Sequence, residues 1–488
     1  MYSPAARVGA LPRRRRRGPD FSLGVLAIYL SYPTVPSLRG IALTADLSHR
    51  RIWQLAWPII LANSAIPLLG LVDTAIIGHN GAEADLGAIA LGALIFSFAY
   101  WSFGFLRMGT TGFAARASGA GDQAEVRATL GRALLLAALI GIGLILLQRP
   151  LALLAFKLLG ASAAVEDGAR LYFQIRIWGA PASLGTFAVM GLLIGLARTR
   201  EILWVQLFLN GLNIGLDWLF AGILGWGVAG IALGTAIAEW CSLALALILA
   251  WRALRAAHDD DQPFWPLARI RDPNRLRAML TANADIMLRT LLLLFSFAWF
   301  INQAATFGDT VLAATHILLQ FISLAAYFLD GYAHAAEPLV GGALGRHDLA
   351  HFDRAIRRST ELAGLTAALL AGILLLGGET LIHLLTDLPA VQAAASDFLP
   401  HCAAYVLCSF AAFQLDGIYI GAGWTGAMRN AAILSTATFL VAAWPLGAAL
   451  GAGGLWLAFI AYVLARAVPL AAWLPRLRRE AGGPNALH

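Results

Sequence analysis

The sequence predicts an all-α integral membrane protein with twelve transmembrane helices in two parallel six-helix lobes around a central cavity. Three observations predict it: the composition, the recurring apolar runs and an internal repeat. Of the 488 residues, 59% are hydrophobic and 13% are charged, whereas a soluble protein carries about 25% charged residues. Apolar runs of the roughly 20 residues needed to cross a bilayer recur along the chain. These runs are too long for barrel strands, so helices must satisfy the backbone in lipid.

Six apolar runs lie in each half of the sequence, and a polar segment separates the halves. The predicted spans lie near 53–78, 86–113, 129–148, 165–196, 201–223, 227–251, 278–304, 310–343, 356–377, 390–421, 430–449 and 453–475. They define an N-terminal lobe at 51–251, a cytoplasmic linker at 252–277, a C-terminal lobe at 278–478 and a cytoplasmic tail at 479–488.

Residues 1–50 differ from the rest of the chain. A run of arginines, Arg13–Arg17, precedes a short apolar stretch, Phe21–Tyr32, in the order that also occurs in signal peptides. The stretch is short and lacks a clear small-residue cleavage site. We therefore expect a basic, disordered extension, or a gene start placed too early.

The positive charge of the chain is distributed as in membrane proteins. The net charge is +7, and nearly all of the basic residues are arginines that lie between apolar runs. Most fall on one side of the predicted membrane; Arg149 and Lys157 are the clear exceptions. The arginine-rich side is predicted to be cytoplasmic, with both termini inside. Because this pattern is not that of a basic groove, no nucleic-acid partner is expected.

The two halves align without gaps at a single offset of 226 residues. Identical residues recur at this offset in several helix pairs, including Leu86 and Leu312, Gly119 and Gly345, Asp122 and Asp348, Ser183 and Ser409, Gly191 and Gly417, Gly195 and Gly421, and Gly225 and Gly451. Six spans per copy give both copies the same orientation, so the repeats are parallel about an axis along the membrane normal. A cleft between two such lobes, open alternately to each side, is typical of transporters.

Several polar residues inside the predicted spans do not follow the repeat. Ionisable groups are costly in lipid and are therefore candidates for function. Five polar residues of the first half have apolar or aromatic counterparts in the second: Asp73, Tyr172, Asn213, Asp217 and Thr235 align with Trp299, Phe398, Phe439, Ala443 and Ala461. They lie at similar depths, about 9–12 Å below the outer helix ends.

These five residues are predicted to form a cation-coupling site. Asn213 and Asp217 are four residues apart, so they share one helix face. Two carboxylates near each other in a low dielectric raise one another's proton affinity, so Asp73 and Asp217 can hold a proton or a small cation. Pro58 lies about four turns before Asp73 and lets that span bend. The alternative is a structural hydrogen-bond network that binds no ion.

The second half has polar residues of its own. Asp285 and Arg289 are four residues apart, acid first, which predicts an ion pair within one helix. Asp330, Glu337 and Asp416 are expected either to line the cavity or to bind arginines near the cytoplasmic end.

Other polar residues are assigned structural roles. Arg107 and Arg176 are expected to be partners for acids. The cysteines lack CxxC spacing and the histidines are scattered, so neither a metal site nor an enzymatic nucleophile set is expected.

Five segments occur in order along the chain: LAWPIILANSAIPLLGLVDTAIIGH, FLRMGTTGFAARASG, DIMLRTLLLL, DGYAHAAEPLVGGALG and LDGIYIGAGWTGAMRN. Together they resemble the multidrug and toxic compound extrusion (MATE) family, DinF-like branch, over about residues 50–478. The resemblance implies an antiporter that exports organic, often cationic, compounds in exchange for protons or sodium ions. It places the bend proline of the family on Pro58 and its cation-site residues on Asp73, Tyr172, Asn213, Asp217 and Thr235. One departure is Gly426, where a charged residue is expected.

We therefore expect a secondary antiporter that exports organic, cationic or amphipathic compounds in exchange for protons. The alternatives are a sodium-coupled exporter of the same family and a lipid or oligosaccharide flippase of the same superfamily. A membrane enzyme is not expected, because no convergent catalytic set is present. The expected partners are a small organic substrate and the lipid bilayer, with no cofactor beyond the coupling ion. We expect a monomer in the bacterial inner membrane.

Overall fold

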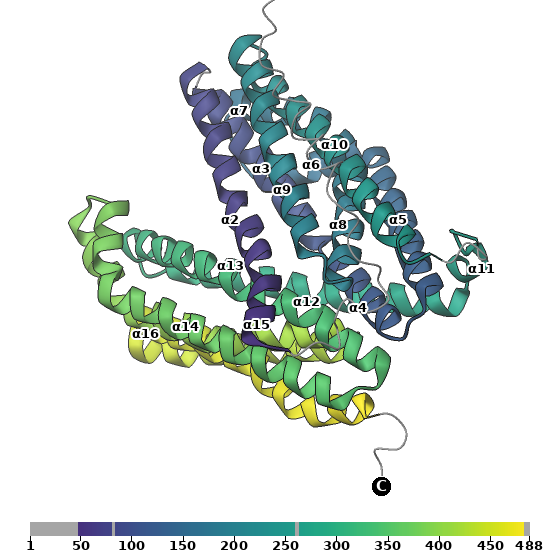
Figure 1. Ribbon diagram of the computed structural model, residues 1–488. Helices are drawn as coiled ribbons and strands as arrows, with labels where there is room; N and C mark the ends of the chain where they lie inside the picture. Colours follow the sequence, from purple (N-terminus) through teal and green to yellow (C-terminus); the bar gives the residue numbers. More distant parts are fainter. Residues whose placement is uncertain (1–46, 81–82, 259–262, 483–488) are drawn as a thin grey trace, which may run out of the picture. The chain divides into compact units, whose positions relative to one another are not determined.

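The computed structural model describes residues 47–80, 83–258 and 263–482, without the side chains of 66–80, and its regular structure there is helical (Figure 1). The N-terminal lobe contains α2 (His49–Asn80), α3 (Glu83–Ser102), α4 (Phe105–Gly119), α5 (Gln123–Leu146), α6 (Gln148–Leu158), α7 (Ala163–Arg176), α8 (Ala180–Gly195), α9 (Thr199–Asp217) and α10 (Gly227–Arg255). After the short α11 (Leu267–Ile270), the C-terminal lobe contains α12 (Pro273–Ala305), α13 (Asp309–Arg346), α14 (Leu349–Leu385), α15 (Pro389–Ala422) and α16 (Thr425–Ala481).

Ten helical segments of the described residues are long and apolar enough to cross a membrane. The last of them, α16, has 57 residues, which is about 85 Å of helix against a hydrocarbon core of about 30 Å. Helical geometry is interrupted inside it at Gly451, whose φ of 62° suits glycine, so α16 supplies two spans. With α2, which covers the first predicted span, the helices account for the twelve predicted spans, and the predicted fold class is confirmed.

The structure also contains features that lie outside or interrupt the predicted spans. The helix α6 lies between the third and fourth spans, and α11 lies in the predicted linker. The fourth span is not continuous, because a 3-10 turn, η1 (Ile177–Gly179), separates α7 from α8. A π-helix, η2 (Trp218–Ile223), continues α9.

Glycines shared by the two halves mark equivalent close contacts between helices. A Cβ on Gly195 of α8 would lie less than 3.0 Å from the carbonyl oxygen of Thr111 on α4. In the C-terminal lobe, a Cβ on Gly421 of α15 would come even closer to the carbonyl oxygen of Glu337 on α13. Thr111 and Glu337 are themselves related by the offset of 226 residues. The repeat therefore keeps glycine where one backbone packs directly on another.

The two lobes meet along α4 and α13. A Cβ on Gly119 of α4 would lie less than 3.0 Å from the carbonyl oxygen of Gly342, and one on Gly345 of α13 would lie as close to that of Arg116. Such a reciprocal contact is what a pseudo-twofold axis produces. Arg116 strengthens this junction, because its Nη1 donates a hydrogen bond to the Ala422 carbonyl of α15 at 2.8 Å.

Candidate functional site

Three of the predicted cation-site residues come together where α9 packs against α10. The side-chain amide of Asn213 donates a hydrogen bond to Oγ1 of Thr235 at 3.1 Å, and Thr235 Oγ1 donates to the Ile231 carbonyl at 2.9 Å. Asn213 is 1% exposed and Asp217 is 0% exposed. Asp217 is the last residue of α9, directly before the π-helix η2. Single π-helical turns inside helices are frequent at functional sites.

A glycine on α10 makes room for the Asp217 carboxylate. A Cβ on Gly234 would lie less than 3.0 Å from Asp217 Oδ1, so the carboxylate lies directly against the turn that carries Thr235. The site gathers carboxylate, amide and hydroxyl oxygens, which can accept a proton or bind a hard cation. In the part of the chain that the structure describes, no three His, Cys, Asp or Glu side chains form a candidate metal cluster.

The predicted residues Asp73 and Pro58 lie on α2. The side chain of Asp73 falls outside the described residues. The helix itself packs against α9 and η2, and Asn210 Nδ2 of α9 donates a hydrogen bond to the Ala65 carbonyl at 3.2 Å. Pro58 is buried, and α2 continues through it, although a proline removes one hydrogen bond from the helix backbone. The helix that carries Asp73 is thus fixed to α9 one turn from Asn213.

Tyr172 belongs to a second polar group around Arg176. Arg176 Nη1 donates a hydrogen bond to the Tyr172 hydroxyl at 2.8 Å, and Arg176 Nη2 lies 3.7 Å from Glu239 Oε1. The guanidinium also lies 4.7 Å from the centre of the Phe96 ring, a cation–π contact. The prediction that Arg176 is a partner for an acid is therefore confirmed. Glu239 follows Thr235 by one turn of α10, so the two polar groups are neighbours on that helix.

Glu239 and Tyr100 are polar residues of this region that the sequence prediction missed. Arg176 lies 5.9 Å from the centre of the Tyr100 ring. The repeat contained the signal for both residues, because Glu239 aligns with Ala465 and Tyr100 aligns with Ala326. A comparison of the halves at every polar position would have included them.

The predicted ion pair between Asp285 and Arg289 is wrong. Arg289 binds Asp416 on α15, which also accepts a hydrogen bond from Arg466 Nη2 at 2.7 Å. Asp285 accepts a hydrogen bond from Arg429 Nη1 of α16 at 2.7 Å. Asp285, Arg289 and Asp416 are all buried. A buried charge without a partner costs several kcal/mol, so each of these side chains pairs with one on another helix.

Glu337 lies on α13 where that helix meets α4. Its carboxylate lies 3.9 Å from Arg107 Nη1 and 4.0 Å from His334 Nδ1, and its side chain is buried. The prediction that Arg107 is a partner for an acid is thus confirmed. Glu337 and Asp416 each lie against an arginine, which agrees with one of the two roles expected for the acids of this lobe. Asp330 is partly buried, and its carbonyl lies 2.6 Å from His334 Nδ1.

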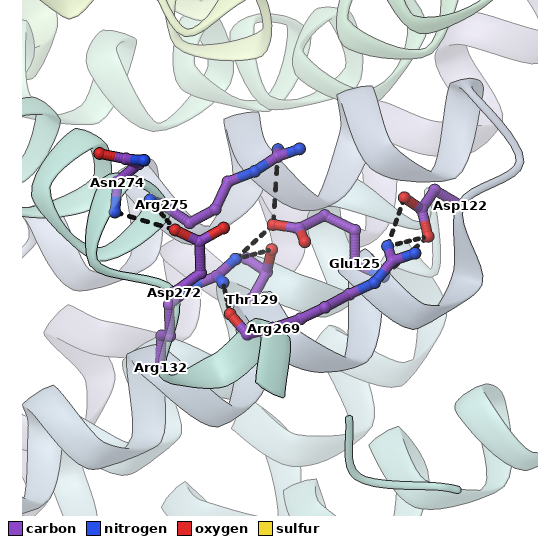
Figure 2. A network of polar contacts seen from close by, with 8 residues as sticks. All are labelled: Asp122, Glu125, Thr129, Arg132, Arg269, Asp272, Asn274 and Arg275. Carbon is purple, nitrogen blue, oxygen red and sulfur yellow. Dashed lines mark hydrogen bonds and ion pairs between the residues drawn. The ribbon is translucent and has the colours of Figure 1, made fainter. Parts of the chain in front are cut away.

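A polar network fixes the linker to α5 (Figure 2). Arg269 Nη1 of α11 donates hydrogen bonds to both carboxylate oxygens of Asp122, at 2.7 and 2.6 Å. Arg132 of α5 donates to the Arg269 carbonyl at 2.7 Å and binds Glu125. Arg275, at the start of α12, lies 3.8 Å from Glu125. The entry to the C-terminal lobe is thereby held on the N-terminal lobe.

Asp122 has two roles in this network, which two substitutions separate. It caps α5 by accepting a hydrogen bond from the Glu125 amide at 3.0 Å, and it pairs with Arg269. Burial raises the pKa of Asp122, but the hydrogen bonds from Arg269 and the Glu125 amide outweigh it and lower the pKa from 3.8. Asp122→Asn keeps a cap and loses the ion pair, at a cost below about 1 kcal/mol because both side chains are well exposed. Asp122→Ala also loses the cap, for about 1 kcal/mol more.

Thermal unfolding of both variants near neutral pH checks this order. The stabilisation by ionised Asp122 is present above pH 3.8 and is lost as the pH falls through the lowered pKa. The difference between the native protein and Asp122→Asn should therefore vanish at a pH well below 3.8. Equal midpoints for the two variants would contradict the capping role.

Known proteins are similar to this chain in both lobes. A family model described as MatE matches residues 58–219 and 286–444. DNA damage-inducible protein F of Escherichia coli (strain K12) is 36% identical over 430 residues, which cover 87% of this chain and 92% of that protein. A probable multidrug resistance protein NorM of Xanthomonas campestris pv. campestris is 28% identical over 449 residues, which cover 85% of this chain and 91% of that protein.

Solved structures share the fold. A MOP superfamily transporter from Pyrococcus furiosus, described as having a binding pocket of reverse polarity, matches with a TM-score of 0.80 at 17% identity, over 92% of this chain and 99% of that chain. An outward-facing multidrug resistance transporter of the MATE family matches with a TM-score of 0.79 at 19% identity and the same coverage. At this identity the likeness concerns the fold, and it agrees with the two six-helix lobes.

Proposed function

The chain belongs to the MATE family of multidrug efflux transporters, and on this premise we propose that it exports organic, cationic or amphipathic compounds in exchange for protons. The family match spans both lobes, and the E. coli relative is 36% identical. The observation that carries the proposal is the buried Asp217, on the face of α9 that holds Asn213 against Thr235. We assign proton binding to these residues together with Asp73, beside Tyr172.

Burial explains why this site suits a proton. An ionised carboxylate in a dry membrane interior costs several kcal/mol, whereas a protonated one is neutral and can donate a hydrogen bond. Asp217 is therefore expected to carry a proton when the site is closed to water and to lose it when water enters. Sodium coupling is the alternative, since the same oxygens suit either ion.

The position of α2 connects this site to the other lobe. Coupling requires that proton and substrate favour different conformations. The helix that carries Asp73 packs against α9 in its own lobe and against α13 in the other. The second contact is close, because a Cβ on Gly331 of α13 would lie less than 3.0 Å from Ile60 of α2. A bend of α2 near Pro58 on proton binding would therefore change the contact between the lobes.

We place this multi-pass protein in the bacterial inner membrane with both termini in the cytoplasm. The arginine-rich loops support this orientation, and among them are Arg269 and Arg275 in the network of Figure 2. One chain supplies both lobes, so the proposed working unit is a monomer.

Flux in proteoliposomes under separately imposed gradients tests the proposal. Ethidium, a fluorescent organic cation, is the probe, and liposomes without protein are the control. We expect a pH gradient without sodium to drive ethidium transport, and a sodium gradient at uniform pH to drive none. Transport driven by the sodium gradient alone would identify sodium, and not the proton, as the coupling ion. Movement of labelled lipid without ethidium flux would favour a flippase and contradict the proposal.

A further inference from the structure

The helix α6 has the features of a helix that lies in the membrane interface. It follows α5, whose 24 residues extend about 36 Å, enough to cross the bilayer core. It therefore lies on the side of the membrane opposite to α11. Phe156 is buried, whereas Leu153, Leu154 and Leu158 are 62%, 57% and 74% exposed. Apolar side chains left exposed next to basic ones are typical of a helix that lies on lipid.

A groove between α6 and the α7–η1 segment has a polar mouth. It has a volume of about 580 Å³, and Gln148, Arg149, Arg170 and Gln174 supply its polar lining. Arg149 is one of the two basic residues that depart from the charge pattern of the chain, and the structure gives it a place in this mouth.

An apolar recess borders this groove. Gln174 and Trp178 line both the groove and a second hollow of about 340 Å³ between α7–η1 and α10, which Leu233, Ile237 and Trp240 complete. Trp178 is 57% exposed and Trp240 is 49% exposed. They come six and five residues after Tyr172 and Thr235, so they lie about 8–9 Å deeper than these residues, at the level of the acyl chains. A groove with polar and basic lining beside an apolar recess suits the polar headgroup and the apolar chains of a phospholipid.

The charges of the mouth leave one positive charge in excess. Arg170 binds Glu166, with Nε at 3.1 Å from Oε1, and its guanidinium lies 4.8 Å from the centre of the Phe156 ring. It is thereby held in position, and its charge is balanced. Arg149 is exposed and takes part in no ion pair among the described residues. One further negative charge, such as that of a phosphodiester, would complement the two arginines, Arg149 and Arg170. Guanidinium groups bind phosphate oxygens well.

We propose that this groove binds one anionic phospholipid of the non-cytoplasmic leaflet. The phosphate lies between Arg149 and Arg170, the polar headgroup contacts Gln148 and Gln174, and one acyl chain follows Trp178 toward α10. A free phosphate ion would not use the apolar recess. The lipid contacts the segment that positions Tyr172 and Arg176, and Trp240 Nε1 of α10 already donates a hydrogen bond to the Trp178 carbonyl at 3.0 Å. The site is thus adjacent to the polar group around Arg176.

Native mass spectrometry of the full-length protein in detergent tests the proposal without any transport measurement. Dioleoylphosphatidylglycerol is titrated against dioleoylphosphatidylcholine. We expect one phosphatidylglycerol to be retained in preference to phosphatidylcholine. In the double variant Arg149→Gln, Arg170→Gln this preference should be about tenfold lower, because each guanidinium supplies a charge-assisted hydrogen bond. Millimolar inorganic phosphate should not displace the lipid, and displacement would assign the mouth to a phosphate ion instead.

The chain provides a matched control on the same helix. Lys157 is exposed on α6 and does not line the groove, so Lys157→Gln should leave the preference unchanged. Arg149→Gln alone, at an exposed side chain, should keep the thermal midpoint and still weaken the preference, which guards against misfolding of the double variant. An equal loss in Lys157→Gln, or no loss in Arg149→Gln, would overturn the proposal. Since no coupling residue is changed, either outcome leaves the proton-coupling proposal unaffected.

Discussion

Asp217→Asn is expected to reduce proton-driven export at least about tenfold, or about 1.4 kcal/mol of barrier, while the protein still folds. The amide has the size of the carboxylate, so it fits against Gly234 in the turn that carries Thr235. It cannot release a proton when water enters the site, so the cycle loses its driving ion. The measurement is ethidium uptake into energised everted membrane vesicles, normalised to the amount of folded protein.

Matched variants separate coupling from general damage. Asp387→Asn makes the same change at an exposed residue between α14 and α15 and should leave uptake unchanged. Thr235→Ser keeps the hydroxyl that accepts from Asn213, whereas Thr235→Val removes it and leaves a buried amide without this partner, which costs about 1–3 kcal/mol. Transport should therefore fall in the valine variant and persist in the serine variant. Undiminished, gradient-dependent uptake by Asp217→Asn would refute the assigned site.

Asp416→Ala is expected to cost about 3–5 kcal/mol of stability, because it leaves two buried arginines without their acid. The side chains of Arg289 and Arg466 are 10% and 5% exposed, so neither can turn to water. They belong to α12 and α16, and Asp416 lies on α15, so the substitution removes a contact that holds three helices of the C-terminal lobe. The thermal midpoint of the purified protein, followed by tryptophan fluorescence, measures the loss.

Asp285→Ala is the matched control for this prediction. Asp285 is about as buried as Asp416, at 8% and 6% exposed, but its charged partner Arg429 has a side chain that is 38% exposed. Arg429 can therefore become solvated after the substitution. The main loss is then the hydrogen bond that Thr425 Oγ1 donates to Asp285 at 3.1 Å, and the expected cost is about 1–2 kcal/mol. Equal shifts in the two variants would show that burial of the acid, rather than burial of its partners, sets the cost.

The spans and the repeat could be predicted because each is visible along the chain without knowing which helices are in contact. A helix that crosses lipid must be about 20 residues long and apolar, whatever its neighbours are. The partners of polar side chains were harder to predict, and the wrong pair Asp285–Arg289 shows why. Spacing of four residues places two side chains on one face of a helix, but it does not say which other helix that face meets. Asp416 and Arg429 lie more than a hundred residues further along the chain.

In the candidate site, too, the positions of the residues along their helices could be predicted, whereas their partners on other helices could not. The sequence placed Asn213, Asp217 and Thr235 at one depth and in one lobe, and the structure brings them together at the contact of α9 with α10. It also placed Tyr172 at that depth, but only the packing of α7 on α10 shows that Arg176 and Glu239 belong with it. The half-to-half comparison could have identified Glu239 as a polar residue of the first lobe only. It could not have identified the ion pair of Glu239 with Arg176.

By itself, the sequence determined twelve spans, two parallel lobes, and a set of polar residues that only the first lobe carries. Hydropathy and a constant offset of 226 residues suffice for this, because both act along the chain. Only the tertiary structure decided that the shared glycines are backbone contacts between helices, which acids bind which arginines, and that Arg149 lines a groove. Each of these depends on how helices far apart in sequence pack, since a buried charge or a missing Cβ has a physical meaning only through the atoms that surround it.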